Sequence, residues 1–214
     1  MLPALPRLDP AALRLVAITD SLRDGIDGLV GRAAAAVEGG ATMVQLRLMD
    51  ETARTLVEVA RALRHAVPSV PLLLNDRADV ALAADADGVH VGNDDISPAS
   101  LRRVVPARFI IGVSVGAEDE VARASGADYV GIGPVFAAGG ASEGGVAIGV
   151  ARFAELARLC GVPAVAVGGI SPENAASVLA AGASGVAVIS ALFGAADPLR
   201  AARALRSVLG ASES

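Results

Sequence analysis

Short apolar runs alternate with segments of helical periodicity along the chain. The apolar runs predict eight buried strands, at residues 15–20, 42–47, 72–74, 87–92, 109–114, 129–133, 164–167 and 185–189. Helices are expected between and after them, at 28–37, 51–66, 77–84, 98–104, 118–125, 150–159, from 171 onward and at 198–209. Strands and helices therefore form eight successive units, and we expect one domain that spans residues 1–214.

This strict alternation predicts a closed parallel (β/α)₈ TIM barrel. Each unit takes roughly 25 residues, and the strands are too apolar for a sheet with one face in water. An open doubly wound sheet is the competing architecture, but it normally carries a glycine-rich phosphate-binding turn after its first strand. Here the first strand ends in Thr19-Asp20, whereas the glycine pair Gly168-Gly169 follows the seventh strand. The barrel is therefore the preferred prediction.

Acidic residues follow two neighbouring strands of the predicted barrel. Asp76 comes after the third strand and Asp95 comes after the fourth, so both carboxylates are expected on the same rim. Mg²⁺ is usually held by one or two carboxylates and leaves its other positions to water and substrate phosphate. Each aspartate read by itself is more simply a helix cap. The pair nevertheless makes a magnesium site the prediction for this rim.

Polar side chains at the ends of strands two, three and five are candidates for binding a substrate. Gln45 and Arg47 lie two residues apart, so they face the same side, next to Asn75 of the following strand. A guanidinium suits a diphosphate, and the amides suit the ring nitrogens and amino group of a heterocycle. Arg47 has an alternative role as a structural partner of Asp76. Ser114 could bind a ligand or the neighbouring backbone.

The glycine pair after strand seven predicts a phosphate site. Gly168 and Gly169 allow an anion to approach the backbone closely, and the loops after strands seven and eight of such barrels commonly hold phosphate. Ile189 and Ser190, after strand eight, can add main-chain N–H groups to the same site. The simpler alternative is that the two glycines only make a tight turn.

The composition excludes some functions. The chain has 214 residues, is 53% hydrophobic, and carries a net charge of -5 with 18 basic residues that are all arginine. No basic cluster stands out and aromatic residues make up 2%, so no nucleic-acid groove is expected. No run approaches the ~18 uninterrupted apolar residues of a membrane span, and the first residues lack a signal-peptide pattern. We expect a cytoplasmic protein with no membrane partner.

Four further residues with reactive or polar side chains are interpreted as structural. Cys160 is the only cysteine and ends a predicted helix without a nearby histidine, so it is not expected to be a nucleophile. His90 lies between two valines, which favours a core histidine with its hydrogen bonds satisfied. His65 is expected on a helix surface. Tyr129 starts the sixth strand and is interpreted as a packing residue.

Several motifs spread over nearly the whole predicted barrel point jointly to one family. They are Ala17-Ile18-Thr19-Asp20, Gln45-Leu46-Arg47, Asn75-Asp76, Asp87-Gly88-Val89-His90-Val91-Gly92 with Asp95, Gly112-Val113-Ser114, Ala127-Asp128-Tyr129-Val130-Gly131-Ile132-Gly133-Pro134-Val135-Phe136 and Gly168-Gly169-Ile170. This set resembles thiamine-phosphate synthase and its TenI relatives. The resemblance implies an enzyme that joins hydroxymethylpyrimidine diphosphate to thiazole phosphate, or to its carboxylate, and releases diphosphate.

The resemblance also implies a role for each candidate residue. Asp76 and Asp95 would hold Mg²⁺, and Arg47 and Ser114 would take part in catalysis. The pyrimidine and its diphosphate would be bound by Gln45, Arg47, Asn75 and Ser114, and the thiazole phosphate by Gly168, Gly169, Ile189 and Ser190. The partners implied are small phosphorylated molecules, and a homodimer is a further expectation.

Two departures from the family pattern reduce the expected activity. Met49 stands where the pattern has lysine, and the loop residues 137–141 lack its threonines and lysine. Each lost charge-assisted contact is worth roughly 1.5 to 3 kcal/mol. The TenI branch fits no better, because Gly116 stands where it carries histidine. Three hypotheses stay open: an active synthase, a tautomerase-like relative, and a non-catalytic barrel that binds a phosphorylated ligand.

Overall fold

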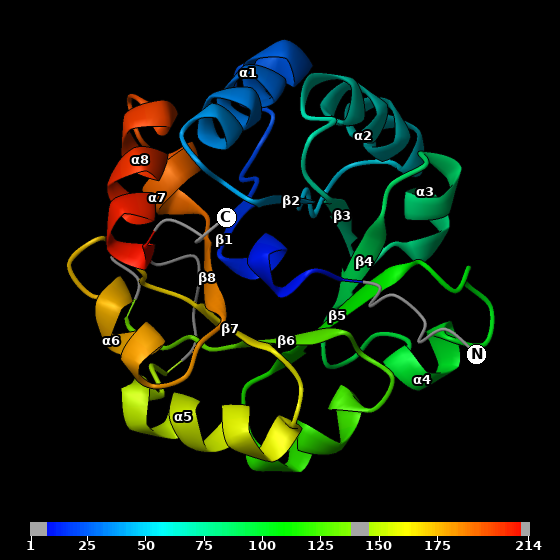
Figure 1. Cartoon of the computed structure of the whole chain (residues 1–214). Coiled ribbons are helices and arrows are strands. Elements are labelled where there is room, and N and C mark those ends of the chain that lie inside the picture. Colours follow the sequence, from blue (N-terminus) through cyan, green and yellow to red (C-terminus); the bar gives the residue numbers. More distant parts are fainter. Residues whose placement is uncertain (1–7, 138–145, 211–214) are drawn as a thin grey trace, which may run out of the picture.

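The chain forms a closed barrel of eight parallel strands surrounded by helices (Figure 1). The structure is a computed structural model that describes residues 8–137 and 146–210. The strands pair in chain order and β8 closes the barrel against β1. They are β1 (Leu15–Ile18), β2 (Met43–Leu46), β3 (Leu72–Asn75), β4 (Gly88–Val91), β5 (Ile110–Val115), β6 (Tyr129–Ile132), β7 (Ala164–Val167) and β8 (Gly185–Val188). The predicted (β/α)₈ barrel is confirmed.

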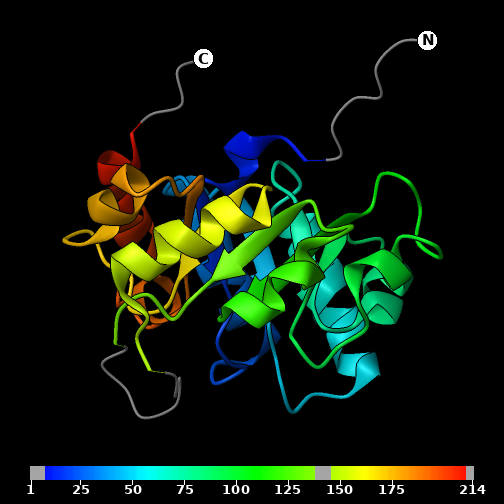
Figure 2. The same cartoon turned by 90° about the horizontal axis from the view of Figure 1, so that it is seen from below.

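The helices cover the outside of the barrel, and Figure 2 shows α5 crossing the outside of the strands. They are α1 (Gly25–Glu38), α2 (Ala53–Ala66), α3 (Ala78–Ala83), α4 (Pro98–Leu101), α5 (Gly149–Cys160), α6 (Ala175–Ala180), α7 (Ser190–Phe193) and α8 (Pro198–Leu209), with 3-10 turns η1 (Pro10–Leu13) and η2 (Glu118–Ala124). In the described part of the chain, no helix is both long and apolar enough to cross a membrane.

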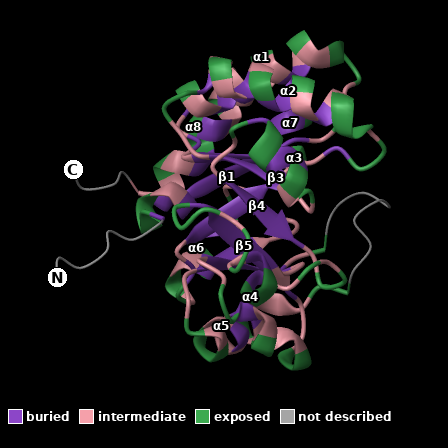
Figure 3. Cartoon of the chain, turned by 90° about the vertical axis from the view of Figure 1, so that its right-hand side faces the viewer, coloured by how far each residue is buried: buried purple, intermediate pink, exposed green. Residues whose placement is uncertain are grey.

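Alternation along each strand divides the apolar residues between two cores. Along β1, Leu15 and Ala17 face the helices, whereas Val16 and Ile18 face the barrel interior. The interior cluster is completed mainly by residues of other strands, namely Met43, Leu73, Ile110, Tyr129, Val165 and Ala187. The strands are therefore buried on both faces, as Figure 3 shows, which explains why they are continuously apolar in the sequence.

Three predicted helices differ from the observed ones for local reasons. The helix expected at 98–104 ends as α4 at Leu101, after which the N–H groups of Arg103 and Val104 bond to the carbonyl oxygens three residues before them. The segment 118–125 is the 3-10 turn η2, in which Glu120 Oε2 accepts the Gly116 N–H at 2.6 Å. The helix expected from 171 begins at Ala175, because Asn174 first accepts the Ser171 N–H and donates to the Gly169 carbonyl.

Candidate functional site

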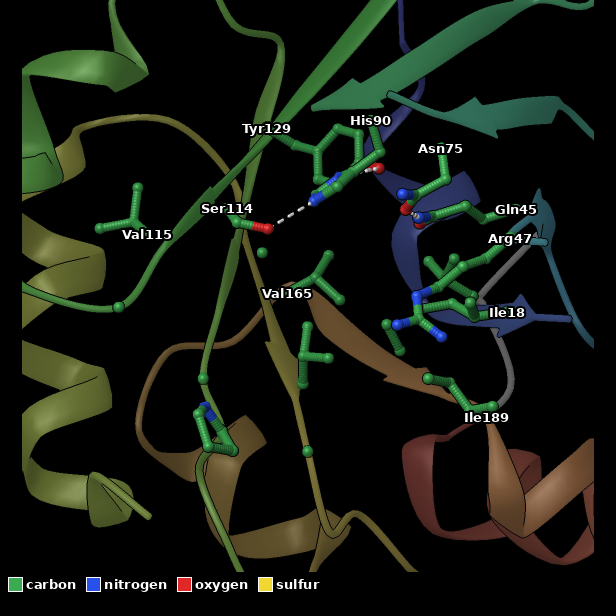
Figure 4. A pocket seen from close by; sticks show the side chains of 18 residues that line it. Ile18, Gln45, Arg47, Asn75, His90, Ser114, Val115, Tyr129, Val165 and Ile189 are labelled. Carbon is green, nitrogen blue, oxygen red and sulfur yellow. Dashed lines mark hydrogen bonds between the residues drawn. The ribbon is translucent and has the colours of Figure 1, made fainter. Parts of the chain in front are cut away.

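A cavity of about 470 Å³ opens at the carboxyl ends of the strands. Every strand contributes to its lining, either with its own residues or with the residue that follows it. The polar lining consists of Gln45, Arg47, Asn75, His90, Ser114 and Tyr129, and Figure 4 shows these side chains around one space. The apolar lining includes Ile18, Val165, Val167 and Ile189. The lining is therefore polar at β2 to β6 and apolar at β7, β8 and β1.

Gln45 and Asn75 form a hydrogen-bonded amide pair. Gln45 pairs with Leu73 in the parallel ladder of β2 and β3, so Asn75 lies two residues further towards the carboxyl end of the barrel. Gln45 Nε2 donates to Asn75 Oδ1 at 2.7 Å, and the Gln45 side chain is buried. This bond fixes how the two amides are turned, and the side-chain oxygen Oε1 of Gln45 stays available to accept from a ligand.

Arg47 follows β2 and is held in place by Thr19, which the sequence analysis did not single out. Arg47 N donates to Thr19 Oγ1 at 2.8 Å, and the same hydroxyl donates to the Arg47 carbonyl at 3.1 Å. Among the described residues, the Arg47 guanidinium has no ion-pair partner, so the alternative of a pair with Asp76 is wrong. A fixed main chain and an unpaired guanidinium suit an anionic ligand.

The carboxyls of Asp76 and Asp95 are close enough to affect each other's ionisation. Burial and, after it, the adjacent Asp95 carboxyl together raise the pKa of Asp76 to about 6, against the smaller lowering effects of the Asn75 side chain and the Gly92 N–H. Two carboxylates this close repel each other unless a proton or a cation lies between them. The pair therefore fits Mg²⁺, whose ligands are oxygen atoms and which tolerates one or two carboxylates.

Neither aspartate caps a helix, so that simpler alternative is wrong. The residue before α3 is Arg77, without a side-chain capping bond, and α4 is capped by Ser97. Asp76 has φ 61°, a left-handed conformation that aspartate tolerates better than most residues. Asp95 instead accepts the Gly92 N–H at 2.7 Å. Neither carboxyl is therefore occupied by the N–H groups of a helix end.

The loop that carries Asp95 is clamped by η2. Arg123 donates to the carbonyl oxygens of Gly92 and Asp95 at 3.1 and 3.0 Å. Asn93 Nδ2 donates to Glu120 at 3.0 Å, and Glu120 also accepts the Gly116 N–H. No pattern in the sequence identified these contacts, because they join segments about thirty residues apart through side chain and backbone.

His90, Ser114 and Tyr129 form a buried polar group at the inner wall of the cavity. His90 Nδ1 lies 2.9 Å from the Tyr129 hydroxyl, and Nε2 lies 3.0 Å from Ser114 Oγ. Burial lowers the pKa of His90 to about 4, although Asp95 acts in the opposite direction. Burial also raises the pKa of Tyr129. At neutral pH the imidazole and the phenol are therefore both uncharged, as expected for a core histidine.

Gly168 and Gly169 border a small hollow together with Ile189 and Ser190, which brings the four predicted phosphate-site residues together. Among the described residues, the main-chain N–H groups of Gly169 and Ser190 have no hydrogen-bond acceptor. Both glycines have positive φ, at 90° and 62°. Tight packing is also a reason for glycine here, because a Cβ on Gly169 would lie 2.7 Å from the Phe136 carbonyl oxygen.

The other residues interpreted from the sequence lie away from the cavity or at its edge. Cys160 ends α5 half-buried, and burial raises the pKa of its thiol, which disfavours the thiolate. His65 is exposed in the last turn of α2. Met49, at the lysine position, is 62% exposed. Of the loop 137–141, residues 138–141 lie outside the described part of the chain.

Comparisons with known proteins agree on one family. The sequence model of the family described as thiamine monophosphate synthase matches residues 15–192. Thiamine-phosphate synthase of Xanthobacter autotrophicus is 46% identical over 94% of this chain and 97% of its own. The synthase of Moorella thermoacetica is 45% identical over 81% and 85%.

Solved structures agree with the sequence comparisons. Thiamine phosphate pyrophosphorylase from Pyrococcus furiosus superposes with a TM-score of 0.83 and 36% identity, over 94% of this chain and 96% of its own. A 3-hexulose-6-phosphate synthase superposes with a TM-score of 0.73 at 24% identity, over 92% of this chain and 100% of its own, a likeness of fold alone.

Proposed function

This chain belongs to the thiamine monophosphate synthase family, and we propose from that premise that it is a thiamine-phosphate synthase. It joins hydroxymethylpyrimidine diphosphate to thiazole phosphate and releases diphosphate; with the thiazole carboxylate as substrate, carbon dioxide is released as well. The observation that carries this proposal is the cavity itself. It has the Arg47 guanidinium and two amides at β2 and β3, and a hollow with free main-chain N–H groups follows β7 and β8, which suits two phosphorylated substrates side by side.

Gln45, Asn75 and Ser114 bind the pyrimidine end of the first substrate. The hydrogen-bonded amide pair offers a fixed oxygen to the amino group of the heterocycle, and Ser114 offers its hydroxyl from β5. Arg47 binds the diphosphate, since its guanidinium lies at the cavity without an ion-pair partner among the described residues. Holding the ring while stabilising the leaving anion is the main demand of this reaction.

Asp76 and Asp95 hold Mg²⁺ in this proposal. When bound, the ion neutralises charge on the diphosphate, which makes it a better leaving group. Without a cation the two carboxylates repel each other, and this repulsion together with burial keeps the pKa of Asp76 raised. The clamp from Arg123 keeps the Asp95 loop in position for this role.

The thiazole phosphate binds at the hollow between β7 and β8. Gly169 and Ser190 donate main-chain N–H groups, with Gly168 and Ile189 completing the wall. In the reaction, the C–O bond between the pyrimidine methylene and the diphosphate breaks, and its electron pair leaves with the diphosphate. The thiazole nitrogen then forms the new bond to that carbon. No side chain needs to remove a proton in this sequence of steps.

The synthase reading is preferred over the two alternatives. The relatives reported above carry the synthase name at 45 to 46% identity. The two carboxylates support a metal-dependent transfer, whereas a tautomerase-like enzyme would need its histidine at the position of Gly116. A turnover reduced by Met49 and by the lack of threonine and lysine in the loop 137–141 stays a prediction. The single domain over 1–214, the cytoplasmic location and the homodimer also stay predictions.

One assay tests the proposal. The protein is incubated with hydroxymethylpyrimidine diphosphate, each thiazole phosphate form in turn, and Mg²⁺, and thiamine phosphate is measured by chromatography. Product that depends on both substrates and is lost with a chelator is the expected result. Binding of thiazole phosphate without any product would instead favour the non-catalytic barrel. The use of only one thiazole form would define the second substrate.

A further inference from the structure

Counting protons shows which group donates and which accepts in the hydrogen bonds that join Tyr129, His90 and Ser114. A neutral imidazole carries one N–H, so one of its nitrogens donates and the other accepts. His90 Nδ1 is the hydrogen-bond partner found for the Tyr129 hydroxyl among the described residues. Tyr129 borders the cavity but is only 2% exposed, whereas Ser114 is partly exposed. If Nδ1 carried the proton, the buried Tyr129 proton would have no acceptor, which folded proteins avoid.

The order of donors that leaves no fully buried proton without an acceptor therefore runs from Tyr129 through His90 to Ser114. The Tyr129 hydroxyl donates to His90 Nδ1 at 2.9 Å, and the imidazole proton lies on Nε2. Nε2 then donates to Ser114 Oγ at 3.0 Å. The proton of Ser114 is left without an acceptor in the described protein, and Ser114 lines the cavity (Figure 4).

We propose that Tyr129 and His90 are positioning residues that hold the Ser114 hydroxyl as a hydrogen-bond donor towards the pyrimidine diphosphate. Ser114 then meets an acceptor atom of that substrate, a diphosphate oxygen or a ring nitrogen, and not its amino group. The proposal rests on the synthase function. Because consecutive hydrogen bonds polarise one another, the two buried groups also make Ser114 a stronger donor.

The barrel makes room for this group with two glycines inside strands. Gly112 pairs with both His90 and Tyr129 in the ladder, and a Cβ there would lie 2.3 Å from Tyr129 Cζ. Gly131 pairs with Ser114, and a Cβ there would lie 3.1 Å from His90 Cε1. Glycine weakens a strand interior, so its use here indicates that the space is needed for the phenol and the imidazole.

The proton order is testable by nitrogen NMR without any turnover. The chain has two histidines, and His65 is exposed, so a His65→Gln variant of the full chain leaves the two ring nitrogens of His90 as the only imidazole signals. A protonated Nε2 and an unprotonated Nδ1 are expected, with Tyr129→Phe increasing the Nδ1–H form. A protonated Nδ1 in the otherwise unchanged protein overturns the proposal.

Kinetics test whether the order matters to the substrate. Ser114→Ala and His90→Leu should each lower kcat/KM for hydroxymethylpyrimidine diphosphate by about tenfold to 100-fold, and the double variant little more. His90→Gln, whose amide N–H can replace that of Nε2, should recover most of the loss. Losses that multiply, or a His90→Gln variant as poor as His90→Leu, overturn the positioning role.

The two proposals fail in distinguishable ways. If the wild-type protein makes no thiamine phosphate, the synthase function is wrong, while the NMR result still decides the proton order. Calorimetry with hydroxymethylpyrimidine diphosphate then replaces kinetics as the readout for Ser114→Ala, and unchanged affinity overturns the donor role. Should His90→Leu fail to fold, Tyr129→Phe and Ser114→Ala carry the test, because both only remove a hydroxyl group.

Discussion

The two sides of the cavity bind through different atoms, those of side chains on one side and those of the main chain on the other. The side-chain half consists of Gln45, Arg47 and Asn75 in the cavity lining, together with Asp76 and Asp95 in the loops that follow β3 and β4. The main-chain half, after β7 and β8, consists of Gly168, Gly169, Ile189 and Ser190 and offers N–H groups. In the first half each group can be removed by one substitution. In the second half the binding atoms belong to the backbone and persist in almost any sequence that folds.

This difference explains what each half demands of the protein. The side-chain half brings two carboxylates together, and burial with like-charge repulsion keeps the pKa of Asp76 at about 6. The main-chain half carries no charge, but it requires positive φ and close packing against the loop after β6. In the side-chain half, the repulsion between the carboxylates therefore lowers the stability of the fold. In the main-chain half, the backbone conformation restricts which residues can stand at the glycine positions. Substitutions should separate the two effects.

Asp76→Asn should have the largest effect. The amide keeps the shape and tolerates φ 61°, but it cannot supply the negative charge that Mg²⁺ needs. We expect synthase turnover to fall at least 100-fold, measured at saturating pyrimidine diphosphate over a range of Mg²⁺ concentrations. The matched control is Asp79→Asn. Asp79 is an exposed acid on α3 that pairs with Arg77, so this change should leave turnover unchanged.

The same variant should be more stable than the wild type without metal. A raised pKa means that the fold favours protonated Asp76, so its contribution to stability is full below 3.8 and is lost as pH rises through about 6. At pH 7.5 the charged group therefore weakens the metal-free fold. Because Asp76 is partly exposed, we expect Asp76→Asn to gain only about 1 kcal/mol. Thermal unfolding with a chelator measures it, and a lower Tm would mean that Asp76 is structural.

Arg47→Met should raise KM for the pyrimidine diphosphate by about tenfold to 100-fold. The guanidinium has no ion-pair partner among the described residues, so its removal leaves no buried charge unpaired and should leave Tm nearly unchanged. Arg54→Met, an exposed change on α2, is the control for loss of an arginine. A large fall in Tm together with an unchanged KM would assign Arg47 to the fold.

The sequence predicted the side-chain half more completely than its supports. Gln45, Arg47, Asn75, Asp76 and Asp95 were recognisable because polar residues ending apolar strands have few structural explanations. Their holders were not recognisable. Thr19 fixes Arg47, and Arg123 clamps the Asp95 loop, through contacts between a side chain and a distant backbone. Such contacts follow no spacing rule, because they depend on the register between strands.

His90 shows the same limit of prediction from sequence, because its burial was predictable and its hydrogen-bond partners were not. The sequence correctly indicated that His90 is buried and hydrogen-bonded, since it stands between valines in a strand. It did not indicate which groups satisfy it, because Ser114 and Tyr129 are 24 and 39 residues away in the chain. The helices were predictable in position, but their ends depended on local contacts such as those of Asn174.

The side-chain half should also respond to pH through Asp76. Mg²⁺ binds the deprotonated pair, so protons compete with it below the pKa of about 6. The Mg²⁺ concentration for half-maximal activity should rise about tenfold between pH 7.5 and pH 5, because a carboxyl with that pKa is then roughly one-tenth ionised. An unchanged Mg²⁺ requirement over this range would contradict the carboxylate pair as the metal site.

Ser190→Ala should have the smallest effect and completes the comparison. If thiazole phosphate is bound by main-chain N–H groups, removing the exposed hydroxyl leaves the binding atoms in place, and KM should change less than about threefold. Gly169→Val is a poorer test, because its Cβ would strike the Phe136 carbonyl whether or not phosphate binds there. Titration calorimetry with thiazole phosphate measures the effect on affinity directly. A loss of tenfold or more in Ser190→Ala would mean that the hydroxyl, and not the backbone, holds the phosphate, so that both halves of the cavity bind through side chains.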